Sequence, residues 1–348
     1  MFALMLVLLS GCGIAAEAPM GPPVAVATAV PRQPDARLVV IDTDMAADDW
    51  LAILYLLQRP DIAVLAITVS GTGEAHCGPG VANARGLLEL TGYPAIPVSC
   101  GRETPLRGDH AFPAAWREGS DGLQGLRLPP AAGPAETRPA PVLLAAVIEA
   151  APRPVTLLAL GPLTNVAEAL QSMPGLGTKL AGITIMGGAV TVPGNIAESA
   201  VPVANPHAEW NIYIDPYAAS IVFQSGAPLT LIPLDATNHV PVNPAFYAQI
   251  KAQHTTPAAT FAYDLLAKNP DFVQSGDYHF WDSLTAATLT DPALVTFQEM
   301  RLRVVEAEGP ESGRTLPDAT GVPARVAVSA DAPGFERIFL ATLNGQVP

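Results

Sequence analysis

The sequence predicts a single α/β domain built on an open, mostly parallel sheet flanked by helices. Strand-like and helix-like segments alternate through most of the 348 residues, which is the pattern of parallel βαβ units with short connections. The chain is 49% hydrophobic, enough to bury one large core, and neither a repeat nor a convincing linker interrupts it after residue 37. We therefore expect one domain.

The expected elements follow the chain in order. Short apolar runs predict strands at 38–42, 62–69, 96–100, 155–160, 182–187 and 228–234. Helices are expected between them at 48–58, 80–91, 141–151, 163–172 and 214–225. Beyond residue 235 the pattern turns helical at 244–254, 258–268 and 281–289. We expect the chain to close with a β-hairpin at 301–305 and 324–328 and a helix near 334–344.

A dense group of acids follows the first expected strand. Within eight positions stand Asp42, Asp44, Asp48 and Asp49. The strand from Leu38 to Ile41 precedes them, and an apolar helical stretch begins at Trp50. The acids therefore lie at the carboxyl end of a strand and the amino end of a helix, where open α/β folds bind their ligands.

Carboxylates this close repel one another, so some must be protonated, point into solvent or share a cation. One interpretation is that Asp48 and Asp49 complement the helix dipole while Asp44 lies in a solvated turn. The number of acids on one turn favours a hard cation instead, Ca²⁺ or Mg²⁺, held by oxygen ligands. No Cys or His lies near enough for the common thiolate and imidazole sites.

The charge balance excludes one class of partner. The formal net charge is −14, and the sequence contains no cluster of Lys and Arg that could neutralise phosphates. We expect no nucleic-acid binding.

The amino terminus has the pattern of a targeting segment. Met1 to Leu9 is apolar but too short to span a bilayer. Leu9-Ser10-Gly11-Cys12 resembles the lipobox of bacterial lipoproteins, in which the cysteine is lipidated. We expect a signal segment at 1–12, a Pro/Ala-rich tether at 13–36 and the domain at 37–348. The protein would then be a periplasmic or cell-envelope lipoprotein that meets the membrane only through its lipid.

An ordinary secretory signal, cleaved after Ala16 or Ala18, is the alternative to lipidation at Cys12. No Lys or Arg precedes the apolar run, so the true start is left open. If Cys12 carries a lipid, Cys77 and Cys100 remain. A disulfide between them is allowed in an oxidising compartment, and two free buried thiols are the equal alternative.

Further segments join the aspartate turn in a fixed order. They are Leu160-Gly161-Pro162-Leu163-Thr164-Asn165, Met186-Gly187-Gly188-Ala189 with Gly194-Asn195, Ala208-Glu209-Trp210-Asn211 with Asp215-Pro216, and Trp281-Asp282-Ser283-Leu284. From about Leu38 to the carboxyl terminus, this set resembles the inosine–uridine-preferring nucleoside hydrolases. The resemblance implies a Rossmann-like open sheet, one bound Ca²⁺ per subunit, a dimer or tetramer, and hydrolysis of the N-glycosidic bond of ribonucleosides to ribose and free base.

The resemblance also implies roles for single residues. Asp44 would be a calcium ligand and the general base for the attacking water. Asp49, Asp282 and the backbone carbonyl of Leu160 would complete the metal shell. The ribose hydroxyls and the 5′ group would be bound by Asp48, Asn195, Glu209 and Asn211. These residue types suit a positively charged, oxocarbenium-like transition state and a cation that holds the vicinal hydroxyls.

Other polar residues in these segments have structural interpretations. We expect Asn165 to be a hydrogen-bonding residue at a helix start and Asp215, which precedes Pro216, to be a helix cap. An extended segment at 209–211 would place Glu209 and Asn211 on one face with Trp210 opposite, and solvated loop residues are the alternative. His207, His239 and His279 lack metal-like spacing and are expected in loops or in the core.

Two departures from the family pattern bear on the substrate. Many members have Asn after the glycine that is Gly71 here, and either Thr72 or Glu74 is the candidate to replace it. Pyrimidine-capable members often have His just before the last aspartate, whereas this chain has Trp281. That tryptophan resembles the purine-specific branch, in which an indole stacks on the base, and a packing role is the alternative. Trp116 is a candidate for the opposite wall of the base site.

These observations predict a Ca²⁺-dependent ribonucleoside hydrolase that prefers purine nucleosides. One alternative is hydrolysis of another ribosyl compound, such as a pyrimidine or modified nucleoside. Another is a non-catalytic nucleoside- or sugar-binding lipoprotein. The presence of Asp44 favours an enzyme, because binding alone needs no base beside the water.

Overall fold

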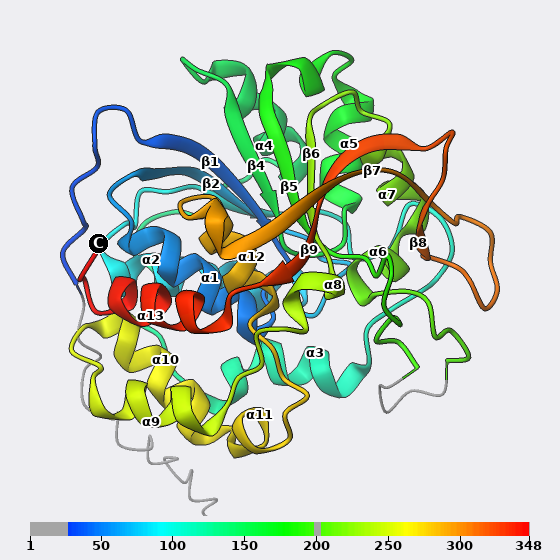
Figure 1. Ribbon diagram of the computed structural model, residues 1–348. Coiled ribbons are helices and arrows are strands. Elements are labelled where there is room, and N and C mark those ends of the chain that lie inside the picture. Colours follow the sequence, from blue (N-terminus) through cyan, green and yellow to red (C-terminus); the bar gives the residue numbers. More distant parts are fainter. Residues whose placement is uncertain (1–26, 198–202, 348) are drawn as a thin grey trace, which may run out of the picture.

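The structure is a computed structural model that describes residues 27–197 and 203–347 (Figure 1). Its described strands are β1 (Arg37–Thr43), β2 (Ile62–Val69), β3 (Val98–Cys100), β4 (Val155–Ala159), β5 (Leu180–Met186), β6 (Leu229–Ile232), β7 (Val295–Val304), β8 (Thr315–Pro317) and β9 (Val322–Ala330). They form one sheet in the order β3-β2-β1-β4-β5-β6-β9-β7-β8. Every neighbouring pair from β3 to β9 is parallel, and β7 is antiparallel to β9 and to β8. From β1, the strand order runs through β2 to β3 on one side and, starting at β4, through β5 to β6 on the other. The switch point of the topology therefore lies between β1 and β4, which is where open sheets bind ligands.

Helices connect these strands and cover the sheet. The described α-helices are α1 (Ala47–Gln58), α2 (Cys77–Thr91), α3 (Ala114–Asp121), α4 (Ala140–Ala150), α5 (Thr164–Ser172), α6 (Trp210–Ile214), α7 (Pro216–Phe223), α8 (Leu234–Thr237), α9 (Pro244–Ala252), α10 (Pro257–Lys268), α11 (Pro270–Gln274), α12 (Trp281–Thr288) and α13 (Ala332–Leu343). Short 3₁₀ turns occur at η1 (Leu123–Gly125), η2 (Leu176–Lys179) and η3 (Pro292–Leu294).

The sheet separates two hydrophobic cores. On one face, α1, α2, α10, α12 and α13 bury the larger core, and on the other α4, α5 and α7 bury the second. Figure 1 shows α12 and α13 on the near side of the sheet, with α9, α10 and α11 grouped beyond α13. This two-sided cover explains why the parallel strands are apolar on both faces.

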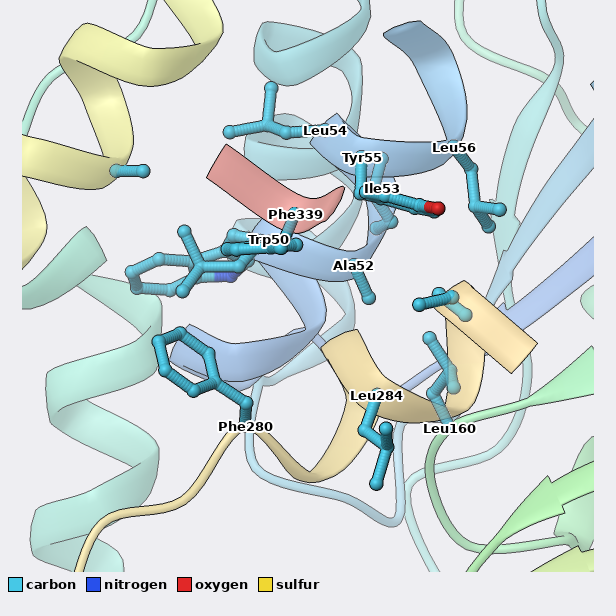
Figure 2. Close-up of a cluster of buried hydrophobic side chains, with 14 of the residues drawn as sticks. Trp50, Ala52, Ile53, Leu54, Tyr55, Leu56, Leu160, Phe280, Leu284 and Phe339 are labelled. Carbon is cyan, nitrogen blue, oxygen red and sulfur yellow. The ribbon is translucent and has the colours of Figure 1, made fainter. Parts of the chain in front are cut away.

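Helix α1 is buried along its whole length. Figure 2 shows its Trp50 beside Phe280, which directly precedes α12, and beside Phe339 of α13. Trp50 also meets the edge of the Phe261 ring, with ring centroids 6.2 Å apart. Because α1 packs on every side, its amino end is held firmly beside α12, which places Asp282 next to the aspartate turn.

Most of the expected elements are confirmed, with three differences. The helix expected at 214–225 is α7 and begins only at Pro216, because Asp215 precedes a proline and leaves the helical region at φ −141°; the residues just before it form a separate short helix, α6, that was not expected. The expected hairpin is longer, pairs β7 with β9, and carries the extra strand β8. Helices α3, α8 and α11 were not expected.

The amino-terminal segments are described in part. The expected signal segment with Cys12, and the tether up to residue 26, lie outside the described residues. Residues 27–36, which the sequence assigns to the tether, run along the domain: the Tyr93 hydroxyl donates to Val30 O at 2.7 Å, and the Gln33 N–H donates to Pro60 O at 2.8 Å. Within the described ranges, no helix is long and apolar enough to cross a membrane.

Cys77 and Cys100 form a disulfide, with their Cα atoms 5.5 Å apart. The bond joins the first residue of α2 to the last residue of β3. The alternative of two free thiols is therefore excluded by the structure.

Candidate active site

A cavity of about 990 Å³ opens at the carboxyl ends of β1 and β4. It is lined by all the residues that the sequence predicts for the metal and the substrate: Asp44, Asp48, Asp49, Leu160, Asn195, Glu209, Asn211, Trp281 and Asp282. The register of the sheet brings the first part of this set together. Asp42 pairs with Ala159, so Asp44 and Leu160 leave neighbouring strands at the same edge.

The aspartate turn is closed by Asp49. One of its carboxylate oxygens accepts the Thr43 hydroxyl and the Asp44 N–H, and the other accepts the Ala46 N–H at 3.1 Å. Asp49 therefore caps the helix on which it stands. Met45 holds a left-handed φ of 60° in this turn, and the Trp50 indole N–H donates to its carbonyl oxygen at 2.8 Å. Strained backbone of this kind persists only where the surroundings impose it.

Asp44 is wedged between two glycines. A Cβ atom at Gly73 would lie 2.0 Å from the Asp44 Cβ, and one at Gly161 would lie 2.6 Å from it. The Glu74 N–H donates to Asp44 Oδ2 at 3.2 Å, and the Ala75 N–H donates to the Asp44 carbonyl oxygen at 2.9 Å. The side chain has little room to move, as a base aimed at one water molecule requires.

The amino end of α12 completes an acidic group. Oxygen atoms of Asp48, Asp49 and Asp282 lie within 4.8 Å of one another. Asp282 Oδ1 is buried and has no hydrogen-bond partner among the described residues. This group of three contains Asp48, which the resemblance assigns to the ribose, and does not contain Asp44. Asp44 is nevertheless close to the group, because the charge of Asp44 raises the pKa of Asp49.

Crowding and burial raise the pKa values of these acids. Burial, followed by the charge of Asp44, raises the pKa of Asp48 to about 7. Burial also raises the pKa of Asp49 and Asp282 well above its ordinary value, and the neighbouring carboxylates add to the effect. Buried carboxylates with an unpartnered oxygen and no other donor type fit a hard divalent cation, which would favour their ionised forms.

Glu209, Asn195 and Asn211 come from the segments that flank residues 198–202 and also line the cavity. The segment is not extended: Glu209 caps α6, and its carboxylate accepts the Asn211 N–H and the Gly188 N–H, both at 2.9 Å. Asn195 Oδ1 accepts the Trp210 N–H at 3.2 Å. Glu209 and Asn211 still line the cavity together, but Trp210 lines it too, contrary to the alternation expected for a strand. Burial raises the pKa of Glu209 to about 7.

Aromatic rings line two parts of the cavity. Phe112 and Trp116 stand against Trp210, with centroids 5.0 and 5.4 Å from its ring. Elsewhere on the cavity wall, Tyr278 stands edge-on to Trp281 at 5.0 Å. Trp116 thus reaches the cavity, as the sequence suggested, but packs on Trp210.

Glu74 is placed in the cavity and Thr72 is not. The Ser120 hydroxyl of α3 donates to Glu74 Oε2 at 2.9 Å, and burial raises the Glu74 pKa to about 8. Thr72 is buried beside the cavity and bonds to the hydroxyls of Ser70 and Thr164. Of the two candidates to replace the family asparagine, Glu74 is therefore the one that a substrate could reach.

Asn165 and Asp215 have the structural positions expected for them. The buried Asn165 amide donates to Asp42 Oδ1 at 2.8 Å, and neither residue lines the cavity. Asp215 caps α7 by accepting the Ala218 N–H at 3.0 Å. Among the cavity-lining residues that the structure describes, there is no histidine.

Tyr278 and Phe272 also line the cavity, which the sequence did not predict. They lie in and after α11, a helix too short to show periodicity. The available signal was the aromatic run Tyr278-His279-Phe280-Trp281 directly before Asp282.

The chain resembles a known family and known proteins along most of its length. The family described as "Inosine-uridine preferring nucleoside hydrolase" matches residues 39–337. Uridine nucleosidase 1 of Arabidopsis thaliana is 33% identical over 286 residues, which cover 80% of this chain and 81% of that protein. The pyrimidine-specific ribonucleoside hydrolase RihA of Citrobacter koseri is 36% identical over 308 residues, covering 85% and 95%.

Among solved structures, the purine-preferring ribonucleoside hydrolase from Gardnerella vaginalis superposes with a TM-score of 0.77. It is 29% identical, and the match covers 89% of this chain and 99% of that one. The fold and the sequence therefore agree in the class of protein to which they point.

Proposed function

The chain belongs to the inosine-uridine preferring nucleoside hydrolase family and is a nucleoside hydrolase, and we propose that it uses Ca²⁺ and prefers purine ribonucleosides. The observation that supports the metal is the group of Asp48, Asp49 and Asp282 with its unpartnered Asp282 Oδ1. The observation that supports the purine is Trp281 in the wall of the cavity.

The residues that would hold the ion are Asp44, Asp49, Asp282 and the carbonyl oxygen of Leu160. All of them are oxygen donors, which Ca²⁺ prefers, and all line one cavity. When bound, the cation supplies a lowered pKa for its water and a contact for the vicinal ribose hydroxyls. Asp48 lies beside two of these ligands, Asp49 and Asp282, and would bind the sugar next to the ion.

Asp44 is the residue we assign to water activation. Its carboxylate is fixed between Gly73 and Gly161, and it takes the proton of the attacking water as the oxygen approaches C1′. Burial raises the pKa of Asp44, which makes its ionised form a better proton acceptor than an exposed aspartate. At neutral pH, a cation held by these ligands would favour the ionised form of Asp44.

The sugar is assigned to Asp48, Asn195, Glu209 and Asn211. Amide groups suit hydroxyls because one amide both donates and accepts. The carboxylates line the cavity that would hold the sugar, and their negative charge would stabilise the positive charge that develops on the ribosyl group. Three backbone N–H groups hold the Glu209 carboxylate, so its position is set before the substrate arrives.

Trp281 is assigned to the base. Its indole is a hydrogen-bond donor but no useful acid, so stacking on a purine is its direct role. Pyrimidine hydrolysis is the second candidate, because two similar relatives are named for uridine or pyrimidine substrates. The structure from Gardnerella vaginalis is named for purines, so the relatives divide on this point.

The test is release of free base from inosine, adenosine, guanosine, uridine and cytidine, with and without a strong calcium chelator. We expect cleavage that the chelator abolishes and added Ca²⁺ restores, with purine nucleosides preferred. Uridine cleaved as fast as inosine would remove the purine preference and leave the metal assignment. Cleavage that survives the chelator would remove the metal assignment.

An Asp44→Asn variant separates an enzyme from a binding protein. We expect it to lose turnover by several orders of magnitude while it still binds inosine, because the amide cannot accept the proton of the water. An unchanged rate would show that Asp44 is not the base.

We also propose that the protein is exported and anchored through a lipid on Cys12. The Leu9-Ser10-Gly11-Cys12 segment supports this. A Cys12→Ser variant expressed in a bacterial host should move from the membrane fraction to a soluble or unprocessed form. An unchanged distribution between the fractions would exclude lipidation at Cys12.

A further inference from the structure

The leaving base lacks an obvious partner in this cavity. Breaking the C1′–N bond leaves an electron pair on a ring nitrogen of the base, and a positioned donor stabilises that charge. Among the described residues that line the cavity there is no His, Lys or Arg. The indole N–H of Trp281 is buried and has no hydrogen-bond partner there.

Tyr278 is the hydroxyl-bearing aromatic residue beside Trp281. Its ring lies parallel to Phe272, with centroids 3.8 Å apart, and meets Trp281 edge-on at 5.0 Å and 78°. The Val242 N–H donates to the Tyr278 carbonyl oxygen at 2.8 Å, which fixes the backbone of Tyr278. Both the main chain and the ring are therefore held in one orientation.

Tyr278 lines the same cavity as the acids of the site. Burial raises the pKa of Tyr278 well above its ordinary value, and the charges of Asp48, Glu74, Asp282 and Asp49 add to the effect. The hydroxyl therefore keeps its proton and is available as a donor. It makes no hydrogen bond to any residue in the two described ranges, so its donor is free for a ligand in the cavity.

We propose that the Tyr278 hydroxyl donates a hydrogen bond to the ring nitrogen of the departing base. This inference rests on the proposed function. As the C1′–N bond breaks, its electron pair passes to that nitrogen, where the Tyr278 O–H stabilises it. Oxygen of the attacking water bonds to C1′, and the proton of the water passes to Asp44. Trp281 stacks on the base, and Tyr278, edge-on to that indole, reaches the rim of a stacked ring.

The test compares two leaving groups in a Tyr278→Phe variant. Phenylalanine keeps the ring that packs on Phe272 and Trp281, so only the hydroxyl is lost. For inosine, or for the best nucleoside of the panel, we expect kcat to fall roughly 10²-fold, as for loss of one transition-state donor. For 4-nitrophenyl β-D-ribofuranoside we expect no change, because nitrophenolate leaves as a stable anion without a donor.

A matched control is Tyr263→Phe. Tyr263 also stacks in an aromatic pair, with Tyr247 at 6.0 Å, but does not line the cavity. We expect it to leave both substrates unaffected. An equal loss on both substrates in Tyr278→Phe would indicate a structural role and overturn the proposal, and so would an unchanged rate on the nucleoside. If the wild type cleaved neither substrate, the proposed function itself would fail and this inference with it.

Discussion

The side-chain amide of Asn211 donates a hydrogen bond to the backbone carbonyl oxygen of Leu160 at 3.0 Å. The same amide also donates to Met186 O at 3.3 Å, so α6 is fastened to the ends of β4 and β5. A residue assigned to the sugar thus orients a carbonyl assigned to the metal. The hydrogen bond therefore connects the residues assigned to the sugar with those assigned to the metal. A substitution among the sugar-binding residues should change the affinity for the metal ion.

An Asn211→Ala variant should therefore weaken calcium binding as well as substrate binding. Loss of a group that orients a metal ligand typically costs tenfold or more in affinity, and we expect about tenfold. Calcium titration in a calorimeter without substrate measures it directly. Asn238→Ala is the control, because Asn238 is exposed at the end of α8. Unchanged calcium affinity in Asn211→Ala would show that the Leu160 carbonyl does not depend on this bond.

The glycines around Asp44 give a second prediction. In Gly73→Ala, the new methyl group would overlap Asp44 Cβ and Oδ2, at 2.0 and 2.5 Å, so the base must move. A displacement of about 1 Å can cost 10²-fold in rate, and we expect a loss of that order in kcat with a smaller change in KM. Gly78→Ala is the matched control, since nothing lies within 4 Å of a Cβ atom there. Equal activity in the two variants would contradict the close fit at Asp44.

The stability of the metal-free protein should fall between pH 5 and pH 8. Burial raises the pKa of Glu209 to about 7 and that of Glu74 to about 8, above their ordinary value of 4.5. Below pH 4.5 the folded and unfolded forms both hold these protons. As the pH rises, the unfolded chain ionises first, so stability is lost by about 1.4 kcal/mol per pH unit for each such carboxyl until its folded pKa is reached.

Urea unfolding of chelator-treated protein at several pH values measures this slope. Added Ca²⁺ should flatten it, because a bound cation favours the ionised carboxylates. Glu209→Gln should also reduce the slope in the metal-free protein, since one titrating group is removed. A stability that rises from pH 5.5 to pH 7.5 without metal would be the opposite of this expectation.

The disulfide should contribute about 3 kcal/mol to the free energy of unfolding. Cys77 and Cys100 are separated by 23 positions, and closing a loop of that size restricts the unfolded chain by about this amount. We expect a Cys77→Ala/Cys100→Ala variant to unfold at lower denaturant concentration. A reducing agent should shift the wild type in the same way and leave the double variant unaffected. A wild type insensitive to reductant, with the bond shown to be broken, would mean that the disulfide adds no stability.

Much of the fold could be predicted because its signals are local. The strand ending at Thr43 and the helix beginning at Ala47 each show their own pattern of apolar residues. The short helices α3, α8 and α11 escaped prediction because four to eight residues give too few turns to show a period. The helix α6 was mistaken for possible strand for the same reason.

By itself, the sequence determined the part of the site that lies on one turn. Asp44, Asp48 and Asp49 stand between a strand and a helix that form from neighbouring residues, so their proximity follows from chain connectivity. Only the tertiary structure decided that Glu74 rather than Thr72 faces the cavity, that Cys77 and Cys100 are bonded, and that Tyr278 lies beside Trp281. These relationships depend on how separate elements pack, and a sequence pattern records which face of an element is apolar but not which distant element will cover it.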